Sequence, residues 1–294
     1  MRILLVHQNF PAQFKHLVPA LAARPGTEVV VITDKDNSRP KPALGPNFRV
    51  LGYPFPLPDT GASPKLAENY AWRVQRGEAA AQLAEDLQGQ GFTPDIVYGH
   101  PGWGETLFLR DVFPRARIIL YAESFYQPEG SGVGFDPEFA DRRLDGRLKA
   151  RTRNAAQLAA LDTADAGISP TAWQASRFPD YWRSRIDVVH DGIDTEAVKP
   201  GPAPALKLGD RGTLKPGDEV VTFINRTLEP SRGYHIFMRA LPKVLAARPS
   251  AQVLIIGGAG NSYGPPAPEG TSWHRLFLDE VRASIDVNRV SFLG

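Results

Sequence analysis

The 294-residue sequence contains no cysteine, which excludes disulfide bonds, thiolate metal sites, iron–sulfur clusters and cysteine nucleophiles. Long hydrophobic runs are also missing. The first apolar run, Ile3–Val6, is shorter than the ~7–15-residue core of a signal peptide, and no run approaches the ~20 apolar residues of a membrane span. We therefore expect a cytoplasmic protein, with peripheral contact at the inner membrane face as an open alternative.

No charge sign and no loop-forming residue type is in large excess. The chain has 34 basic and 32 acidic residues, giving a net charge of +2, so we expect no nucleic-acid partner. Its 27 glycines and 27 prolines, about 18% of the chain, stay below the roughly 25–30% of low-complexity sequences. A globular protein with many short loops is predicted, and its length suits about two domains of ~150 residues.

The common nucleotide and metal motifs are absent. Gly258 and Gly260 begin a dinucleotide-like pattern, but Tyr263 occupies the place of the third glycine, and the prolines at 265 and 266 prevent a helix from starting there. There is no Gly-Lys pair for a phosphate-binding loop, no His-Glu-x-x-His and no Gly-x-Ser-x-Gly. We expect neither a bound metal nor a cofactor.

Short apolar runs alternate with helical patterns in residues 1–195, which predicts a parallel α/β domain. The runs are continuous, as in strands that are covered on both faces. The expected strands are Arg2–His7, Glu28–Thr33, Phe48–Tyr53, Asp95–Tyr98, Arg117–Ala122, Ala166–Ile168 and Ile186–His190. The expected helices are Gln13–Arg24, Lys65–Gln90, Glu105–Asp111, Glu138–Thr163 and Thr171–Ser176.

Residues 196–218 contain four prolines and four glycines without a periodic pattern, so we interpret them as a linker. The alternation restarts in residues 219–294. The expected elements there are the strands Glu219–Asn225, Gln252–Ile256 and Arg289–Leu293 and the helices Tyr234–Arg248 and Ser272–Ser284. A doubly wound nucleotide domain usually has five or six strands, so we expect residues 219–294 to be the first part of a longer domain.

Polar residues follow three predicted strands of the first domain. Gln8 and Asn9 follow the first strand, His100 and Trp103 follow the fourth, and Glu123 follows the fifth. Open α/β sheets bind ligands at the carboxyl ends of their strands, so these five residues are candidates for a site. Gln8 and Asn9 could instead cap a turn, Trp103 could be a core residue rather than a platform for a sugar ring, and Glu123 could be an ordinary surface carboxylate.

Two arginines bracket a turn in the second domain. Arg226 ends a predicted strand, and Arg232 and Gly233 open the next helix. Guanidinium groups donate bidentate hydrogen bonds and a helix N-terminus adds backbone N–H groups, so this arrangement suits a diphosphate. The alternative is a pair of solvated charges at a helix start.

Together with Ile168–Thr171, His190–Asp194 and the final strand Arg289–Gly294, this turn resembles the family 4 glycosyltransferases of the GT-B type. The resemblance implies two Rossmann-like domains: an acceptor domain at residues 1–195 and a donor domain at residues 219–294, which is incomplete here. It implies retaining transfer of a sugar from a nucleotide diphosphate sugar to a sugar or lipid acceptor in glycan or glycolipid biosynthesis, usually without a metal.

The resemblance makes Arg226 and Arg232, with Gly233, donor-binding. From their positions after strands, we expect Glu123 and His100 to be catalytic and Gln8, Asn9 and Trp103 to be acceptor-binding. Arg232 stands where many relatives carry lysine, and Glu123 where many carry histidine. A catalytically silent fragment that binds a saccharide or a partner is the alternative function, and the sequence leaves the oligomeric state open.

Overall fold

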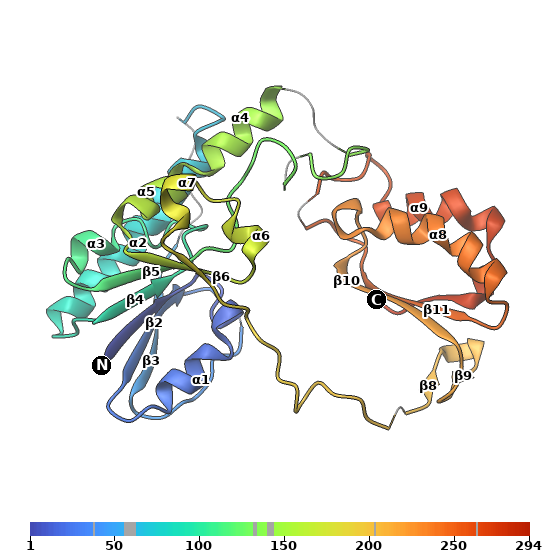
Figure 1. Ribbon diagram of the computed structural model, residues 1–294, viewed down its shortest axis with the longest axis horizontal. Helices are drawn as coiled ribbons and strands as arrows, with labels where there is room; N and C mark the ends of the chain where they lie inside the picture. Colours follow the sequence, from blue (N-terminus) through green and yellow to red (C-terminus); the bar gives the residue numbers. More distant parts are fainter. Residues whose placement is uncertain (38, 56–62, 132–133, 140–143, 203, 263) are drawn as a thin grey trace. The chain divides into compact units, whose positions relative to one another are not determined.

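The computed structural model describes residues 1–37, 39–55, 63–131, 134–139, 144–202, 204–262 and 264–294. The chain divides into two compact units (Figure 1). Residues 1–133 and 141–193 form the first unit, and residues 134–140 and 194–294 form the second. Each unit is built on a parallel β-sheet, as the alternating pattern of the sequence predicts.

The first unit contains a seven-stranded parallel sheet with the strand order β3-β2-β1-β4-β5-β6-β7. Its strands are β1 (Arg2–Val6), β2 (Glu28–Asp34), β3 (Phe48–Tyr53), β4 (Ile96–Gly99), β5 (Arg117–Tyr121), β6 (Ala166–Ser169) and β7 (Ile186–Val188). All seven predicted strands are present, with ends that differ by two residues at most. From β1 the chain adds β2 and β3 on one side, and it then returns to add β4 to β7 on the other side. In open α/β sheets, this change of direction between β1 and β4 leaves a ligand-binding crevice at the carboxyl ends of these two strands.

Helices cover both faces of this sheet (Figure 1). The helical segments are η1 (Ala12–Phe14), α1 (Leu17–Ala22), α2 (Glu68–Gly89), α3 (Leu109–Val112), α4 (Leu144–Arg153), α5 (Ala155–Thr163), α6 (Ala172–Ala175) and α7 (Asp180–Arg183). Along β1, Leu4 packs in the cluster that includes Ala80 of α2, and Leu5 packs in the cluster that includes Val18 of α1. Successive residues of a strand point to opposite faces, so both faces need apolar residues and the strands are continuous apolar runs.

Three predicted helices of the first unit are wrong in extent. The segment Glu105–Asp111 is helical only from Leu109, where α3 begins. The segment Gln13–Arg24 is divided into η1 and α1, and α1 starts so that Pro19 falls in its first turn, where a missing N–H costs no intrahelical bond. The predicted helix Glu138–Thr163 is two helices that meet at Asn154. The Asn154 side chain bonds both the N–H and the carbonyl of Tyr126, at 2.9 and 2.7 Å. Residues 140–143 lie outside the described residues.

Glu138 and Phe139 belong to the second unit rather than to a helix of the first. The Glu138 carboxylate accepts two hydrogen bonds from Arg239, at 2.6 and 2.8 Å. The Phe139 ring contacts Trp273 and Phe277 edge to face, with centroid distances of 5.2 and 6.1 Å. A segment that lies between two strands of the first sheet in sequence therefore contributes to the apolar core of the second unit.

The second unit has a three-stranded parallel sheet in the order β10-β11-β12. Its elements are β10 (Val220–Thr227), η3 (Pro230–Arg232), α8 (Tyr234–Ala247), β11 (Gln252–Gly258), α9 (Trp273–Val281), η4 (Arg282–Ser284), η5 (Val287–Arg289) and β12 (Val290–Phe292). Every predicted strand and helix of residues 219–294 is present. Residues 196–218, predicted to be a linker without structure, contain an antiparallel pair, β8 (Leu206–Lys207) and β9 (Thr213–Leu214), around η2 (Gly209–Arg211). Strands of two residues are too short to show an alternating pattern.

The loop after β4 packs directly on the backbone of α2. Gly104 has φ +111°, and a Cβ atom there would overlap with the main-chain carbonyl oxygen of Arg73. The next residue, Glu105, accepts a hydrogen bond from the Tyr53 hydroxyl at 2.8 Å, and Arg76 donates to the same hydroxyl at 2.8 Å. Burial raises the pKa of Glu105. The backbone of this loop is therefore fixed by a close approach and a buried polar network.

We expect Gly104→Ala to lower the free energy of unfolding by at least about 3 kcal/mol, as substitutions that force backbone atoms apart do. Gly91→Ala is the matched control, because Gly91 also has a positive φ, +87°, but has open space around it. It should cost only about 1–2 kcal/mol, the strain of a left-handed backbone with a Cβ. Urea unfolding of the two variants measures the difference, and equal losses would show that the contact with Arg73 is unimportant.

Candidate functional site

Polar side chains gather where three neighbouring strands of the first sheet end. His7 directly follows β1, His100 directly follows β4, and Glu123 lies two residues after β5. The rings of His7 and His100 lie 5.4 Å apart between centroids. Since the strand order reverses between β1 and β4, these residues occupy the switch point of the sheet, where open α/β folds bind ligands.

His100 and Glu123, both predicted from the sequence, are in direct contact. The His100 Nε2 atom lies 2.9 Å from Glu123 Oε2, and the Gly102 N–H donates to His100 Nδ1 at 2.9 Å. Because Nδ1 accepts a hydrogen bond, Nε2 carries the proton and donates it to the carboxylate. His100 is 5% exposed, whereas the Glu123 side chain is 38% exposed, so the carboxylate lies at the rim of the site.

Gln13 is a second donor to this carboxylate and was not predicted. Its Nε2 atom donates to Glu123 Oε2 at 3.2 Å, and the residues that the structure describes give no hydrogen bond to Oε1. Burial would raise the pKa of Glu123, but the hydrogen bonds from His100 and Gln13 outweigh it, so the pKa lies below its usual value. Glu123 is thus ionised at neutral pH, with one oxygen facing outward. A glutamine at the start of a predicted helix gave no signal of this contact.

His7 is buried and its ring contacts the ring of His100. It is 3% exposed, and its Nδ1 atom accepts a hydrogen bond from the Asn9 N–H at 2.9 Å. Burial, together with the neighbouring His100, lowers the pKa of His7 to about 3. A neutral imidazole is therefore locked between His100 and the ring of Phe14, which lies 5.7 Å away edge-on.

The predicted acceptor residues lie in two loops of this site. The main-chain carbonyl of Gln8 accepts a hydrogen bond from Thr33 Oγ1 at 2.9 Å, and the N–H of Asn9 bonds His7. Both therefore hold the loop after β1 in place through their backbones. Trp103 is half-buried, and its ring lies 6.2 Å from that of His100. Their roles toward an acceptor stay predictions.

The predicted donor residues surround the turn between β10 and α8. Arg226 is exposed one residue before the end of β10, Arg232 ends η3, and Gly233 has φ +75° at the start of α8. The Asn225 side chain donates to the Arg232 carbonyl at 3.4 Å, which closes the turn. The structure confirms the predicted turn between a strand and a helix with an arginine on each side. Diphosphate binding at this turn stays a prediction.

Glu229 is an unpredicted residue in the same turn. Its side chain is 0% exposed, and its carboxylate accepts hydrogen bonds from Thr227 Oγ1 at 2.9 Å, from Ser262 Oγ, from the Ser262 N–H at 3.1 Å and from the Gly264 N–H at 3.4 Å. Burial would raise the pKa of Glu229, but the bonds from Ser262, Thr227 and Ser231 lower it to about 2. In the sequence, this glutamate is simply one of several polar residues at a helix start.

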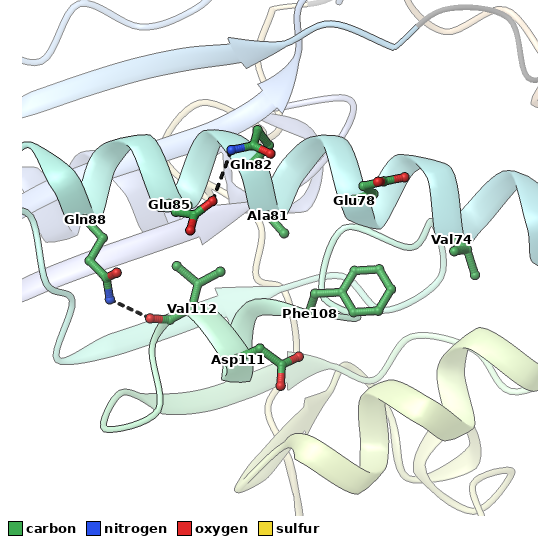
Figure 2. A pocket seen from close by; sticks show the side chains of 9 residues that line it. All are labelled: Val74, Glu78, Ala81, Gln82, Glu85, Gln88, Phe108, Asp111 and Val112. Atoms are coloured by element: carbon green, nitrogen blue, oxygen red, sulfur yellow. Dashed lines mark hydrogen bonds between the residues drawn. The ribbon is translucent and has the colours of Figure 1, made fainter.

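A cavity of about 610 Å³ lies elsewhere in the first unit (Figure 2). It is an open groove between α2 and α3, and it is lined by Val74, Glu78, Ala81, Gln82, Glu85, Gln88, Phe108, Asp111 and Val112. None of the residues at the strand ends lines it. Sheet topology and the hydrogen-bonded cluster, rather than the volume of a groove, therefore locate the candidate site.

The described residues contain neither a metal-binding cluster nor a membrane-spanning helix. Among them, no three histidine or acidic side chains come close enough together to hold a metal ion. The described helices include none with both the length and the apolar character needed to cross a lipid bilayer.

Comparison with known proteins relates this geometry to a family. The family described as "Glycosyl transferase family 4 group" matches residues 25–198. The D-inositol 3-phosphate glycosyltransferase of Segniliparus rotundus is 31% identical over 109 residues, which are 36% of this chain and 23% of the relative. The enzyme of the same name from Mycobacterium marinum is 32% identical over 138 residues, which are 45% and 26% of the two chains. The chain thus matches about a quarter of the length of these relatives.

Solved structures are similar over the whole chain. HepE of Anabaena in complex with UDP has a TM-score of 0.57 and 16% identity, and the match covers 100% of this chain and 69% of that one. An α,α-trehalose-phosphate synthase from Burkholderia vietnamiensis has a TM-score of 0.56 and 12% identity, with 100% and 73% covered. At such identities the likeness shows the fold alone, and it confirms the predicted GT-B type of α/β fold.

We expect acid to destabilise the protein partly through His7. The pKa of His7 is about 3 in the folded protein and about 6.5 when unfolded, so between these values the unfolded state binds the extra proton. Stability is therefore lost as pH falls from about 6.5 toward 3, with a limiting slope of about 1.4 kcal/mol per pH unit.

His7→Asn keeps an acceptor for the Asn9 N–H but cannot titrate, so its stability should fall less steeply with acid. Urea unfolding at pH 4 to 7 measures this slope. His16→Asn is the control, because His16 is exposed. Equal slopes for wild type and His7→Asn would contradict the assignment.

Proposed function

The chain belongs to the glycosyl transferase family 4 group, and from this premise we propose that it transfers a sugar from a nucleotide diphosphate sugar to an acceptor hydroxyl with retention of configuration, in glycan or glycolipid biosynthesis. The observation that carries the proposal is the bonded cluster of His100, Gln13 and Glu123 at the switch point of the first sheet. The relatives named as glycosyltransferases favour a transferase over a silent binding module. The UDP in the HepE structure supports a nucleotide sugar as the donor.

Glu123 is the group that would contact the acceptor. Its Oε2 atom is held by His100 and Gln13, and Oε1 faces outward, where it can accept a hydrogen bond from a sugar hydroxyl. A lowered pKa makes a carboxylate a poor general base, because efficient bases have pKa values near the working pH. The same charge makes it a strong hydrogen-bond acceptor. We therefore assign Glu123 to orienting the acceptor hydroxyl, and His100 to holding Glu123 ionised.

The acceptor group is a hydroxyl of a sugar, and this sugar is either free or linked to a lipid. The ring of Trp103 beside His100 offers an apolar face on which a sugar can stack. Gln8 and Asn9 lie on the adjoining loop and can add hydrogen bonds to its other hydroxyl groups.

The donor would bind at the β10–α8 turn of the second unit. Arg226 and Arg232 supply two positive charges, and Gly233 begins the 14-residue helix α8, whose first N–H groups favour an anion. Negative charge grows on the nucleotide diphosphate as its bond to the sugar breaks. Fixed cations and helix-end amides stabilise that charge, so the residues named here provide electrostatic rather than covalent catalysis.

Arg226→Ala should weaken binding of a nucleoside diphosphate by about 1.5–3 kcal/mol, the usual worth of a hydrogen bond to a charged group. Calorimetric titration with UDP, GDP and ADP measures the loss. Arg275→Ala is the control, because Arg275 is an exposed arginine on α9 of the same unit, paired with Asp279. An affinity that Arg226→Ala leaves unchanged would remove Arg226 from the site.

Glu123→Gln should lower the turnover number about 100-fold, within the range for losing one preorganised polar group. It should leave nucleoside diphosphate affinity unchanged, because the proposed donor residues all belong to the other unit. Transfer of labelled sugar to free and lipid-linked acceptors measures turnover and separates the two acceptor classes. Glu85→Gln, in the groove of Figure 2, is the control. Full activity of Glu123→Gln would exclude the assigned role.

A further inference from the structure

Two loops that follow neighbouring strands of the second unit are joined by one buried carboxylate. Glu229 lies in the loop after β10, and its donors Ser262 and Gly264 lie in the loop after β11. Thr227 Oγ1 and Ser262 Oγ both donate to Glu229 Oε1 and lie 2.9 Å apart, so one carboxylate oxygen connects the two loops through a small hydrogen-bonded network. This network ties the glycine-rich segment after β11 to the turn that carries the arginine pair.

The backbone is shaped to bring these groups together. The pairing of β10 with β11 shifts after Ile224 and resumes where Thr227 faces Gly258. A Cβ atom at Gly257 would lie 2.8 Å from the carbonyl oxygen of Asn225, so only glycine allows the strands to approach there. The Leu228 N–H then donates to the Gly258 carbonyl at 2.9 Å. These contacts fix both loops on either side of Glu229.

Glu229 also faces the second arginine of the predicted diphosphate site. Arg232 Nε lies 3.9 Å from Glu229 Oε1, and the Arg232 N–H donates to the Glu229 carbonyl at 3.0 Å. The carboxylate is fully buried, whereas the arginine side chain is 31% exposed. A fixed, buried negative charge beside a partly exposed guanidinium restricts the orientation of that guanidinium.

We propose that Glu229 is a positioning residue for donor binding: its buried carboxylate holds the loop after β11 against the β10–α8 turn and orients Arg232 toward the diphosphate. The inference rests on the proposed function, because it takes the diphosphate site from there. A binding site whose cation is already oriented loses less conformational entropy when the anion arrives. Glu229 itself need not touch the ligand.

Glu229→Gln separates charge from shape. The amide oxygen of glutamine can still accept from the Ser262 and Gly264 N–H groups, and its NH₂ group can donate to the hydroxyls of Thr227 and Ser262, which can rotate to accept. The network is thereby kept, while the negative charge that faces Arg232 is lost. Thr227→Val is a second variant, which removes one donor to the carboxylate and keeps the side-chain volume.

The test is a double-mutant cycle on the full chain, with UDP, GDP and ADP as calorimetric probes and thermal unfolding as a check of folding. We expect Glu229→Gln to weaken affinity about 10-fold or more, as loss of a charged interaction does. In an Arg232→Ala background, the same change should have less than about a two-fold effect, because coupled residues are not additive. Thr227→Val should show the same dependence on Arg232 with a loss of about three-fold. Glu138→Gln, which removes an ion pair with Arg239 in the same unit, should leave affinity unchanged.

Two results would overturn the inference and leave the proposed function in place. One is unchanged affinity in folded Glu229→Gln or, if that variant does not fold, in folded Thr227→Val. The other is an equal loss with and without Arg232, which indicates a general structural role. If the wild-type chain binds none of the three nucleotides, the diphosphate site itself is wrong, and the inference falls with it.

Discussion

The burial of a parallel sheet on both faces is the constraint on which the first unit depends. Because helices cover both faces, the residues of the strands are mostly apolar, and the polar groups His7, His100 and Glu123 lie beyond the carboxyl ends of the strands. The reversal of strand order between β1 and β4 then decides which loops meet there. The His100 imidazole is hydrogen-bonded to the Glu123 carboxylate, and the His7 ring contacts the His100 ring, because this topology places the loop after β1 beside the loops after β4 and β5.

Each of the two candidate sites contains a glutamate carboxylate, and the two carboxylates differ in their exposure to solvent. In the first unit, the carboxylate of Glu123 lies at the rim, held by the His100 imidazole and the Gln13 amide, and keeps one oxygen directed outward. In the second unit, the carboxylate of Glu229 is fully enclosed by N–H and O–H donors. The exposed carboxylate is suited to contact a ligand, and the enclosed one is suited to hold two loops together. The surroundings of the two carboxylates therefore favour ligand binding by Glu123 and a structural role for Glu229.

Most elements of the fold could be predicted from the sequence, because continuous apolar runs bounded by glycine and proline are typical of buried parallel strands. The strand-to-helix turn with Arg226 and Arg232, and the strand-end position of His100 and Glu123, could be predicted for the same reason. Gln13 and Glu229 could not, since their importance comes from partners 110 and 33 residues away rather than from local spacing. The break at Asn154 escaped prediction because its side chain bonds the main chain of Tyr126, a contact that leaves no periodic trace.

The short segment that contains Glu138 and Phe139 makes the second unit discontinuous in the chain. Its aromatic ring and carboxylate belong to the core and surface of that unit, yet they are encoded between β5 and α4 of the other one. Recombination that exchanged residues 194–294 alone would thus separate Arg239 and Trp273 from the side chains they contact. The two halves of this protein are therefore expected to be inherited together, with coordinated changes at these positions, rather than shuffled as independent modules.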